Sequence, residues 1–204
     1  VYTQLEKSSF NGEIWPVHPT KKKLGQHKCY ENLETLPYPP DATFIGVNRH
    51  KTIEIVRKLD SMGAGGAVCF ASGFSETKIE RNNDEGSELQ KELTDAATKL
   101  ALLGPNCYGF LNYLDNVTLW PDQHGGQRIT SGVAIIAQSS NIAINLTMQK
   151  RSLPIAFILT VGNQAKSGIS DLIQMLLDDD RITAVGLYIE GFDNIQKFET
   201  AASR

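Results

Sequence analysis

The feature that most constrains the fold of this chain is a repeated alternation between short apolar runs and stretches with helical periodicity. The apolar runs predict buried strands at 42–47, 65–70, 101–103, 132–137, 155–161 and 184–189. Between and after them, apolar residues at helical spacing predict helices at 51–62, 87–100, 139–150, 169–177 and 195–202. Such an alternation is typical of the α/β class, in which a parallel sheet carries helices on both faces.

A polar, glycine-rich stretch at 122–131 interrupts this alternation, which then restarts at Gly132. Stretches of this composition usually form loops or linkers. The interruption therefore predicts two domains, residues 1–125 and residues 126–204. A length of 204 residues is compatible with two modest domains.

Composition excludes several classes of protein. The 20 lysines and arginines against 23 acidic residues give a net charge of −3, so we expect no nucleic-acid partner. The three cysteines are widely spaced and form no Cys-x-x-Cys, which argues against a disulfide framework or a zinc site and favours a cytoplasmic location. Every apolar run is shorter than the roughly 20 residues of a membrane span. The chain starts with Val1 rather than methionine, so we expect a piece of a longer protein.

Ligands of open α/β sheets bind beyond the carboxyl ends of the strands, and this rule selects the loops to examine. The segments that directly follow predicted strands are Asn48-Arg49, Ala71-Ser72-Gly73, Pro105-Asn106-Cys107, Gln138-Ser139-Ser140, Gly162-Asn163 and Glu190-Gly191.

Two of these loops allow both a structural and a functional interpretation. Residues 104–109 (Gly-Pro-Asn-Cys-Tyr-Gly) can be a tight turn or a rigid loop that presents backbone groups to a ligand. Its Cys107 fits a small buried residue better than a nucleophile, because no strong base is nearby in sequence. Gln138-Ser139-Ser140 precedes a predicted helix, where the hydroxyls can cap the helix and its free amides can bind an anion.

The remaining polar residues give weaker signals. Glu190 ends an apolar strand and can face a crevice or solvent. Asp178, Asp179 and Asp180 are consecutive, do not share one face, and predict a solvated turn rather than a metal site. The four histidines lack ligand spacing, so we expect no metal. A Gly-x-Gly-x-x-Gly dinucleotide fingerprint is also missing, which argues against a nicotinamide-dependent oxidoreductase.

The strand-end loops resemble, in their order, those of the NDP-forming (ADP-forming) acyl-CoA synthetases, which are relatives of the succinyl-CoA synthetase α subunit. The matching segments are 10–19 (FNGEIWPVHP), 71–76 (ASGFSE), 103–109 (LGPNCYG), 133–139 (VAIIAQS), Gly162-Asn163, 180–183 (DRIT) and 187–191 (LYIEG). The resemblance covers nearly the whole chain.

The resemblance implies a Rossmann-like CoA-binding domain that lacks its first strand and its glycine-rich loop, followed by part of a flavodoxin-like domain. It also implies an activity: the ligation of a small carboxylic acid to CoA with ATP, through an acyl phosphate and a phosphohistidine. A separate ATP-grasp module, outside this chain or in another subunit, would bind ATP and Mg²⁺. None of the four histidines matches the phosphohistidine, so we expect this piece alone to be inactive. The resemblance also implies that the full protein forms an oligomer.

The resemblance also implies roles for individual residues. Lys21 would lie near a CoA phosphate, and Phe70, Ala71 and Ser72 would line the CoA site. Asn106 and Cys107 would sit at the centre where the thioester forms. Gln138, Ser139 and Ser140 would bind phosphate, and Glu190 would orient the phosphohistidine ring.

Two departures from the family pattern concern the same loops. The usual Gln-Ser-Gly is Gln138-Ser139-Ser140 here, and the usual Val-Pro is Val47-Asn48. An alternative function is therefore a non-catalytic CoA or acyl-CoA sensor, similar to the ligase-like module fused to some protein acetyltransferases.

Overall fold

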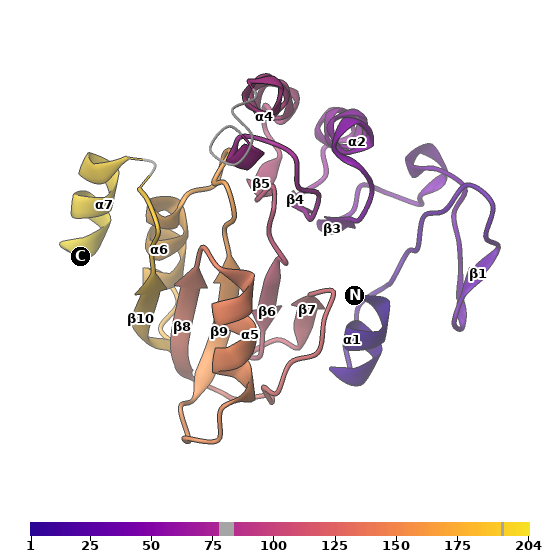
Figure 1. Ribbon diagram of the computed structural model, residues 1–204. Coiled ribbons are helices and arrows are strands. Elements are labelled where there is room, and N and C mark those ends of the chain that lie inside the picture. Colours follow the sequence, from indigo (N-terminus) through magenta and orange to yellow (C-terminus); the bar gives the residue numbers. More distant parts are fainter. Residues whose placement is uncertain (78–83, 193) are drawn as a thin grey trace.

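The apolar runs form strands that divide between two sheets (Figure 1). The computed structural model describes residues 1–77, 84–192 and 194–204. One sheet has three parallel strands in the order β3-β4-β5, and the other has five strands in the order β10-β8-β9-β6-β7. The strands are β3 (Ala42–Ile45), β4 (Gly66–Cys69), β5 (Ala101–Leu103), β6 (Phe110–Asn112), β7 (Val117–Leu119), β8 (Gly132–Ala137), β9 (Ile155–Thr160) and β10 (Ile182–Tyr188).

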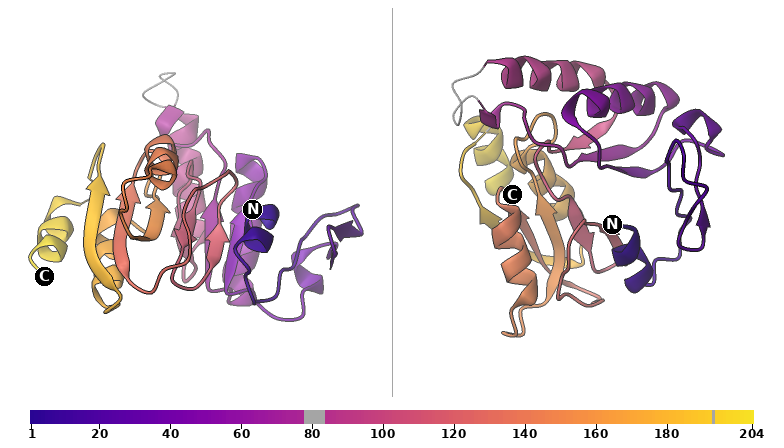
Figure 2. Two further views of the ribbon diagram at one scale, coloured as in Figure 1. Left: turned by 90° about the horizontal axis from the view of Figure 1, so that it is seen from below. Right: turned by 45° about the vertical axis from the view of Figure 1, so that its right-hand side comes forward.

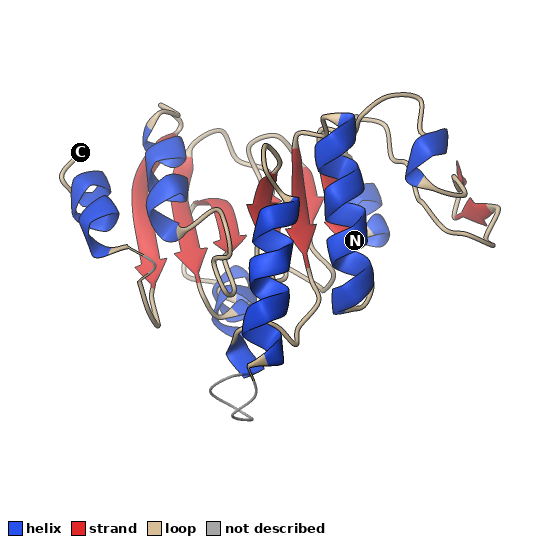
Figure 3. Ribbon diagram, turned by 90° about the horizontal axis from the view of Figure 1, so that it is seen from above, coloured by secondary structure: helices blue, strands red, loops and turns tan. Residues whose placement is uncertain are grey.

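Two helices, α2 (Arg49–Met62) and α4 (Glu85–Ala96), lie side by side over the three-stranded sheet (Figure 3). Helix α2 begins two residues earlier than predicted because the Asn48 side chain accepts a hydrogen bond from the Lys51 amide at 3.0 Å. Helix α4 ends earlier than predicted. After it, the amides of Lys99 and Leu100 donate to an oxygen of Asp60 at 2.7 and 2.8 Å instead of continuing the helix.

The two faces of the three-stranded sheet are covered differently. Alternate residues such as Ile45 and Ala67 pack in one cluster with the apolar side chains of α2 and α4. The residues that point the other way, Val68 and Leu103, pack in a second cluster that includes Leu159 of the other sheet. Among the described residues this second face is thus covered by the other half of the chain, whereas helices on both faces were predicted.

The five-stranded sheet does have helices on both faces. Helix α5 (Ser140–Met148) covers one face, where Ile135 and Ala137 of β8 point. Helices α6 (Ile169–Leu177) and α7 (Ile195–Ala202) cover the face to which Ala134 and Ile136 point. Strands β8, β9 and β10 are parallel, as predicted, and the ranges of α6 and α7 coincide with the predicted ones.

The sequence patterns did not predict the hairpin of β6 and β7. Each strand is only three residues long, too short for a periodic pattern to be recognised. Strand β6 pairs with β9 in antiparallel fashion, so a segment that precedes the polar stretch at 122–131 extends the sheet that follows it. The domain boundary at 125/126 remains a prediction, but the hydrogen bonds between strands extend across it.

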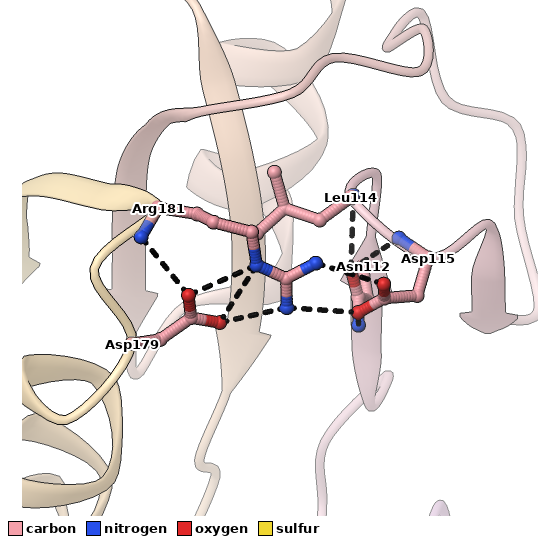
Figure 4. A network of polar contacts seen from close by, with 5 residues as sticks. All are labelled: Asn112, Leu114, Asp115, Asp179 and Arg181. Atoms are coloured by element: carbon pink, nitrogen blue, oxygen red, sulfur yellow. Dashed lines mark hydrogen bonds and ion pairs between the residues drawn. The ribbon is translucent and has the colours of Figure 1, made fainter.

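Arg181 fixes the turn of this hairpin to the start of β10 (Figure 4). Its guanidinium forms two hydrogen bonds with Asp115, at 2.9 and 3.2 Å, and also contacts both carboxylate oxygens of Asp179. Asn112 completes the turn by accepting the amides of Leu114 and Asp115 at 3.0 Å. The acidic run that predicted a solvated turn thus includes one member, Asp179, that binds this arginine.

The first 40 residues lie mostly at the end of the molecule away from α7 (Figures 1 and 2). They form α1 (Tyr2–Lys7), a hairpin of β1 (Lys23–Leu24) and β2 (His27–Lys28), and a short 3-10 helix, η1 (Leu33–Thr35). No helix in the described ranges has the length and apolar character needed to cross a membrane.

Candidate functional site

The loops that follow β3, β4, β5, β8 and β10 converge on one cleft of about 1070 Å³, whereas the loop after β9 is not in its lining. The cleft receives residues from both sheets, as expected for the carboxyl ends of parallel strands. Its lining consists of Gly46, Val47, Asn48, Arg49, Phe70, Ala71, Ser72, Gly73, Glu76, Thr77, Asn106, Cys107, Tyr108, Gln138, Ser139, Ser140, Asn141 and Glu190. Nine of the ten predicted site residues are in this lining, and Lys21 is not.

Phe70, Ala71 and Ser72 follow β4 and form one wall of the cleft. The Phe70 ring is 40% exposed, and its centroid lies 5.6 Å from that of Tyr108. Tyr108 in turn packs edge-on against the buried Trp120 at 5.4 Å. The wall therefore offers an apolar aromatic surface beside polar backbone groups, an arrangement suited to a ligand that has both apolar and polar parts.

The loop after β5 presents backbone rather than reactive side chains. Asn106 adopts a left-handed φ of 59°, and its amide donates to the carbonyl of Ala71 at 2.9 Å, which joins two walls of the cleft. Cys107 is only 2% exposed, and burial raises the pKa of its thiol to about 12. The thiol is therefore protonated at neutral pH, in keeping with a small buried residue rather than a nucleophile.

Gln138, Ser139 and Ser140 bring the start of α5 to the cleft. The Ser139 side chain caps the helix by accepting from the Ile142 amide at 3.5 Å. Asn48 caps α2 in the same way on the other side of the cleft. Two helix N-termini thus open into one space, and the partial positive charge at each favours an anionic ligand.

Glu190 is exposed and lines the cleft, two residues after the end of β10. Its position depends on Gln138, whose side-chain oxygen accepts the backbone amides of Glu190 and, at 2.8 Å, Gly191. The oxygen of Gln138 is therefore occupied by the protein itself. Gln138 therefore supports the loop that carries Glu190, and it also lines the cleft.

Lys21 is not in the cleft lining and lies in the exposed segment that leads into β1. Its amide donates to the His18 ring nitrogen at 3.1 Å. The structure therefore does not bring Lys21 together with the other predicted residues.

Arg49 and Glu76 are cleft residues that the sequence patterns did not single out as site residues. Arg49 donates to the Gly73 carbonyl at 2.7 Å and pairs with Glu85 at 2.7 Å. The Glu76 carboxylate accepts the amides of Gly73 and Phe74. Arg49 follows a predicted strand, and Glu76 ends the matching segment 71–76, but neither pattern assigned a role to these two side chains. Within the described ranges, no cluster of three or more His, Cys, Asp or Glu residues could hold a metal ion.

Two family models match the chain. The model for a CoA binding domain matches residues 1–113, more than half of the chain. The model for a succinyl-CoA ligase like flavodoxin domain matches residues 130–204. Their order along the chain is the order that the resemblance implies.

Curated relatives match nearly the whole chain. Trans-feruloyl-CoA synthase FCS1 from an unknown prokaryotic organism is 31% identical, and the match covers 98% of this chain and 29% of that protein. Acetate–CoA ligase [ADP-forming] II subunit alpha from Pyrococcus furiosus is 27% identical, with 95% of this chain and 41% of the subunit covered. The chain thus spans less than half the length of these relatives.

Solved structures share the fold. The dinucleotide forming acetyl-coenzyme A synthetase 1 of Ca. Korarchaeum cryptofilum, solved in complex with phosphate and ADP, superimposes with a TM-score of 0.87 at 28% identity. The superposition covers 100% of this chain and 43% of the synthetase. Together with the CoA-binding match over more than half of the residues, these findings show that the chain belongs to the CoA-binding domain family of the ADP-forming acyl-CoA synthetases.

Proposed function

We propose that the chain is the CoA-binding portion of an acid–thiol ligase that joins a carboxylic acid to CoA and converts ATP to ADP and phosphate. The observation that carries this proposal is the single cleft, shared by both sheets, into which the N-termini of α2 and α5 open. CoA and the reaction intermediates bear phosphate groups, and helix N-termini stabilise such anions without moving during the reaction.

The cleft residues divide between two tasks in this proposal. The β4 loop with Phe70, Ala71 and Ser72 binds CoA, and Asn106 with the Cys107 backbone borders the reacting carbonyl. The start of α5, at Ser139 and Ser140, binds the phosphate of the acyl phosphate. Phosphoryl transfer needs positioning and charge stabilisation more than covalent chemistry by the protein, so a buried thiol at Cys107 is compatible with this arrangement.

The remaining components are partners rather than parts of this chain. A phosphohistidine shuttles the phosphoryl group, and an ATP-grasp module binds ATP and Mg²⁺ in a longer chain or a second subunit. Glu190, in the cleft lining, orients the histidine ring. The relatives named above are ligases, which favours this function over a non-catalytic CoA sensor.

Two measurements test the proposed function. In isothermal titration, the full-length protein should bind CoA, because the helix N-termini at the cleft favour its phosphate groups. In the full-length protein, labelled ATP should give an acid-labile phosphoprotein. Glu190→Gln should reduce its yield by about tenfold or more, whereas Glu199→Gln, on the exposed side of α7, should not. Absence of the acid-labile label in the full-length protein would contradict the ligase function.

A further inference from the structure

The shape of the β4 loop is set by two side chains that bond to its backbone. Gly73 has a φ of 95°, and its amide donates to Glu76 Oε1 at 2.6 Å, while the Phe74 amide donates to Oε2 at 3.1 Å. From the other direction, Arg49 Nη1 donates to the Gly73 carbonyl at 2.7 Å. These three hydrogen bonds hold the loop at 71–74 between the Glu76 carboxylate and the Arg49 guanidinium.

Glu76 is itself held from the other sheet. Asn163, in the loop after β9, donates through Nδ2 to Glu76 Oε2 and, at 3.0 Å, to Gln90 Oε1 of α4. Gln90 Oε1 also accepts the hydroxyl of Ser75 at 2.6 Å. One amide group of the flavodoxin-like half thus joins the β4 loop to helix α4.

The backbone of Asn163 makes a further contact between the halves. Its amide donates at 3.0 Å to the carbonyl of Pro105, in the loop after β5 that also contains Asn106. The next residues continue this contact, because the Ala165 amide donates to the Gly104 carbonyl at 3.0 Å. Asn163 therefore bonds to the loops after both β4 and β5, although its own side chain is not part of the cleft lining.

We propose that Asn163 is a positioning residue that sets the shape of the CoA-binding loop 71–74 through Glu76. The inference rests on the proposed function only for the identity of the ligand. An asparagine amide can donate both of its hydrogens to two acceptors, as this site requires. An aspartate of the same shape donates none and would place a second negative charge against Glu76.

The test is a two-residue cycle in the full-length protein. Asn163→Asp should weaken CoA binding by about tenfold or more, because it removes a hydrogen bond to a charged group and adds repulsion. Adding Glu76→Gln should restore part of the affinity, since it removes the like-charge repulsion and its new amide can donate to the aspartate at position 163 while its oxygen still accepts the Gly73 amide. The Phe74 amide then faces an NH2 group and loses its acceptor, so the rescue is incomplete. Asn163→Ala, which removes the donors without adding charge, should cause a smaller loss.

Hydrogen exchange of the Gly73 and Phe74 amides gives a readout that does not depend on CoA. Exchange of both amides should be faster in Asn163→Asp than in the wild type, and that of Gly73 should slow again in the double variant. Asn11→Asp makes the same chemical change at an exposed position outside the cleft lining and should affect neither readout.

Two different results overturn the two proposals. If Asn163→Asp folds and both CoA affinity and the exchange of Gly73 and Phe74 match the wild type, the positioning role is wrong. If the full-length wild-type protein does not bind CoA, the proposed function is wrong, and the exchange rates alone decide whether Asn163 shapes the loop.

Discussion

At the scale of single residues, Gly162 shows how closely the two halves approach each other. It has a left-handed φ of 52°, and a Cβ atom there would lie 2.1 Å from the Pro105 carbonyl oxygen. Only a residue without a side chain allows the loop after β9 to contact the loop after β5 in this way. The hydrogen bond between Asn163 and Pro105 depends on that approach.

Gly162→Ala should therefore destabilise the protein by more than about 2 kcal/mol, because backbone strain and steric overlap add together. Gly63→Ala is a matched control. Gly63 ends α2 with a φ of 78°, and a Cβ atom there would meet no other atom within 4 Å, so the cost should be only about 1 kcal/mol. Urea unfolding measures both values, and equal costs would contradict the close contact at Gly162.

Local sequence predicted some residues of the site and not others. Ser139 was recognisable because a hydroxyl before a helical pattern is a common cap, and the structure confirms the cap. The contact of Glu76 with Asn163 was not predictable, although both residues lie in segments that resemble the family, because 87 residues separate them and only the packing of two sheets brings them together. Lys21 was assigned by resemblance, and its place outside the cleft depends on the path of the first 40 residues.

At the scale of elements, Asp60 links the end of α2 to the segment between α4 and β5. Its carboxylate accepts from the Thr98 hydroxyl at 2.6 Å and from the amides of Lys99 and Leu100. These bonds, that of Thr98 first, lower the pKa of Asp60 to about 2. They also explain why the chain leaves the helix before Leu100 although Leu100 continues the apolar face.

This link should make stability depend on pH in the acid range. The folded pKa is lowered, so the contribution of Asp60 is complete above about pH 4 and is lost as the pH falls toward 2. The difference in unfolding free energy between wild type and Asp60→Asn should accordingly be largest above pH 4 and should shrink below it. Thr98→Val removes the first donor and should reduce the pH dependence. A difference that stays constant from pH 6 to pH 2 would contradict the lowered pKa.

Periodicity predicted the longer elements and failed for the short ones. The ranges of α6 and α7 both agree with the prediction. Helix α6 buries a continuous apolar face that includes Leu172, Ile173 and Leu176, whereas α7 buries Ala201 and packs against α6. The three-residue strands β6 and β7 owe their conformation to pairing with β9 rather than to their own composition. Such tertiary effects are not encoded within a short window of sequence.

At the scale of the whole molecule, one hydrophobic cluster extends through both halves. It contains Val68 and Leu103 of the three-stranded sheet together with Ile136 and Leu159 of the five-stranded sheet. The predicted boundary at 125/126 marks a change in the sequence pattern, but this hydrophobic cluster contains residues from both sides of it.

Neither residues 1–125 nor residues 126–204 should fold cooperatively when produced alone. Separation would expose the shared apolar face, whose burial contributes about 25 cal/mol per Å². Thermal unfolding followed by circular dichroism should show one transition for the full chain and broad, weak transitions for each part. Mixing the two parts should sharpen the transition. Sharp, independent transitions in the separate parts would show two autonomous domains instead.

The hairpin of β6 and β7 also has a consequence for the behaviour of the protein in solution. Strand β9 (Ile155–Thr160) is uncharged, lacks proline and is almost entirely buried, a composition that promotes aggregation when the edge of such a strand is exposed. Strand β6 pairs with that edge of β9, and Arg181, at the start of β10, binds Asp115 in the turn between β6 and β7. The hairpin of β6 and β7, which the sequence patterns did not predict, thus keeps the edge of β9 from pairing with other copies of the chain.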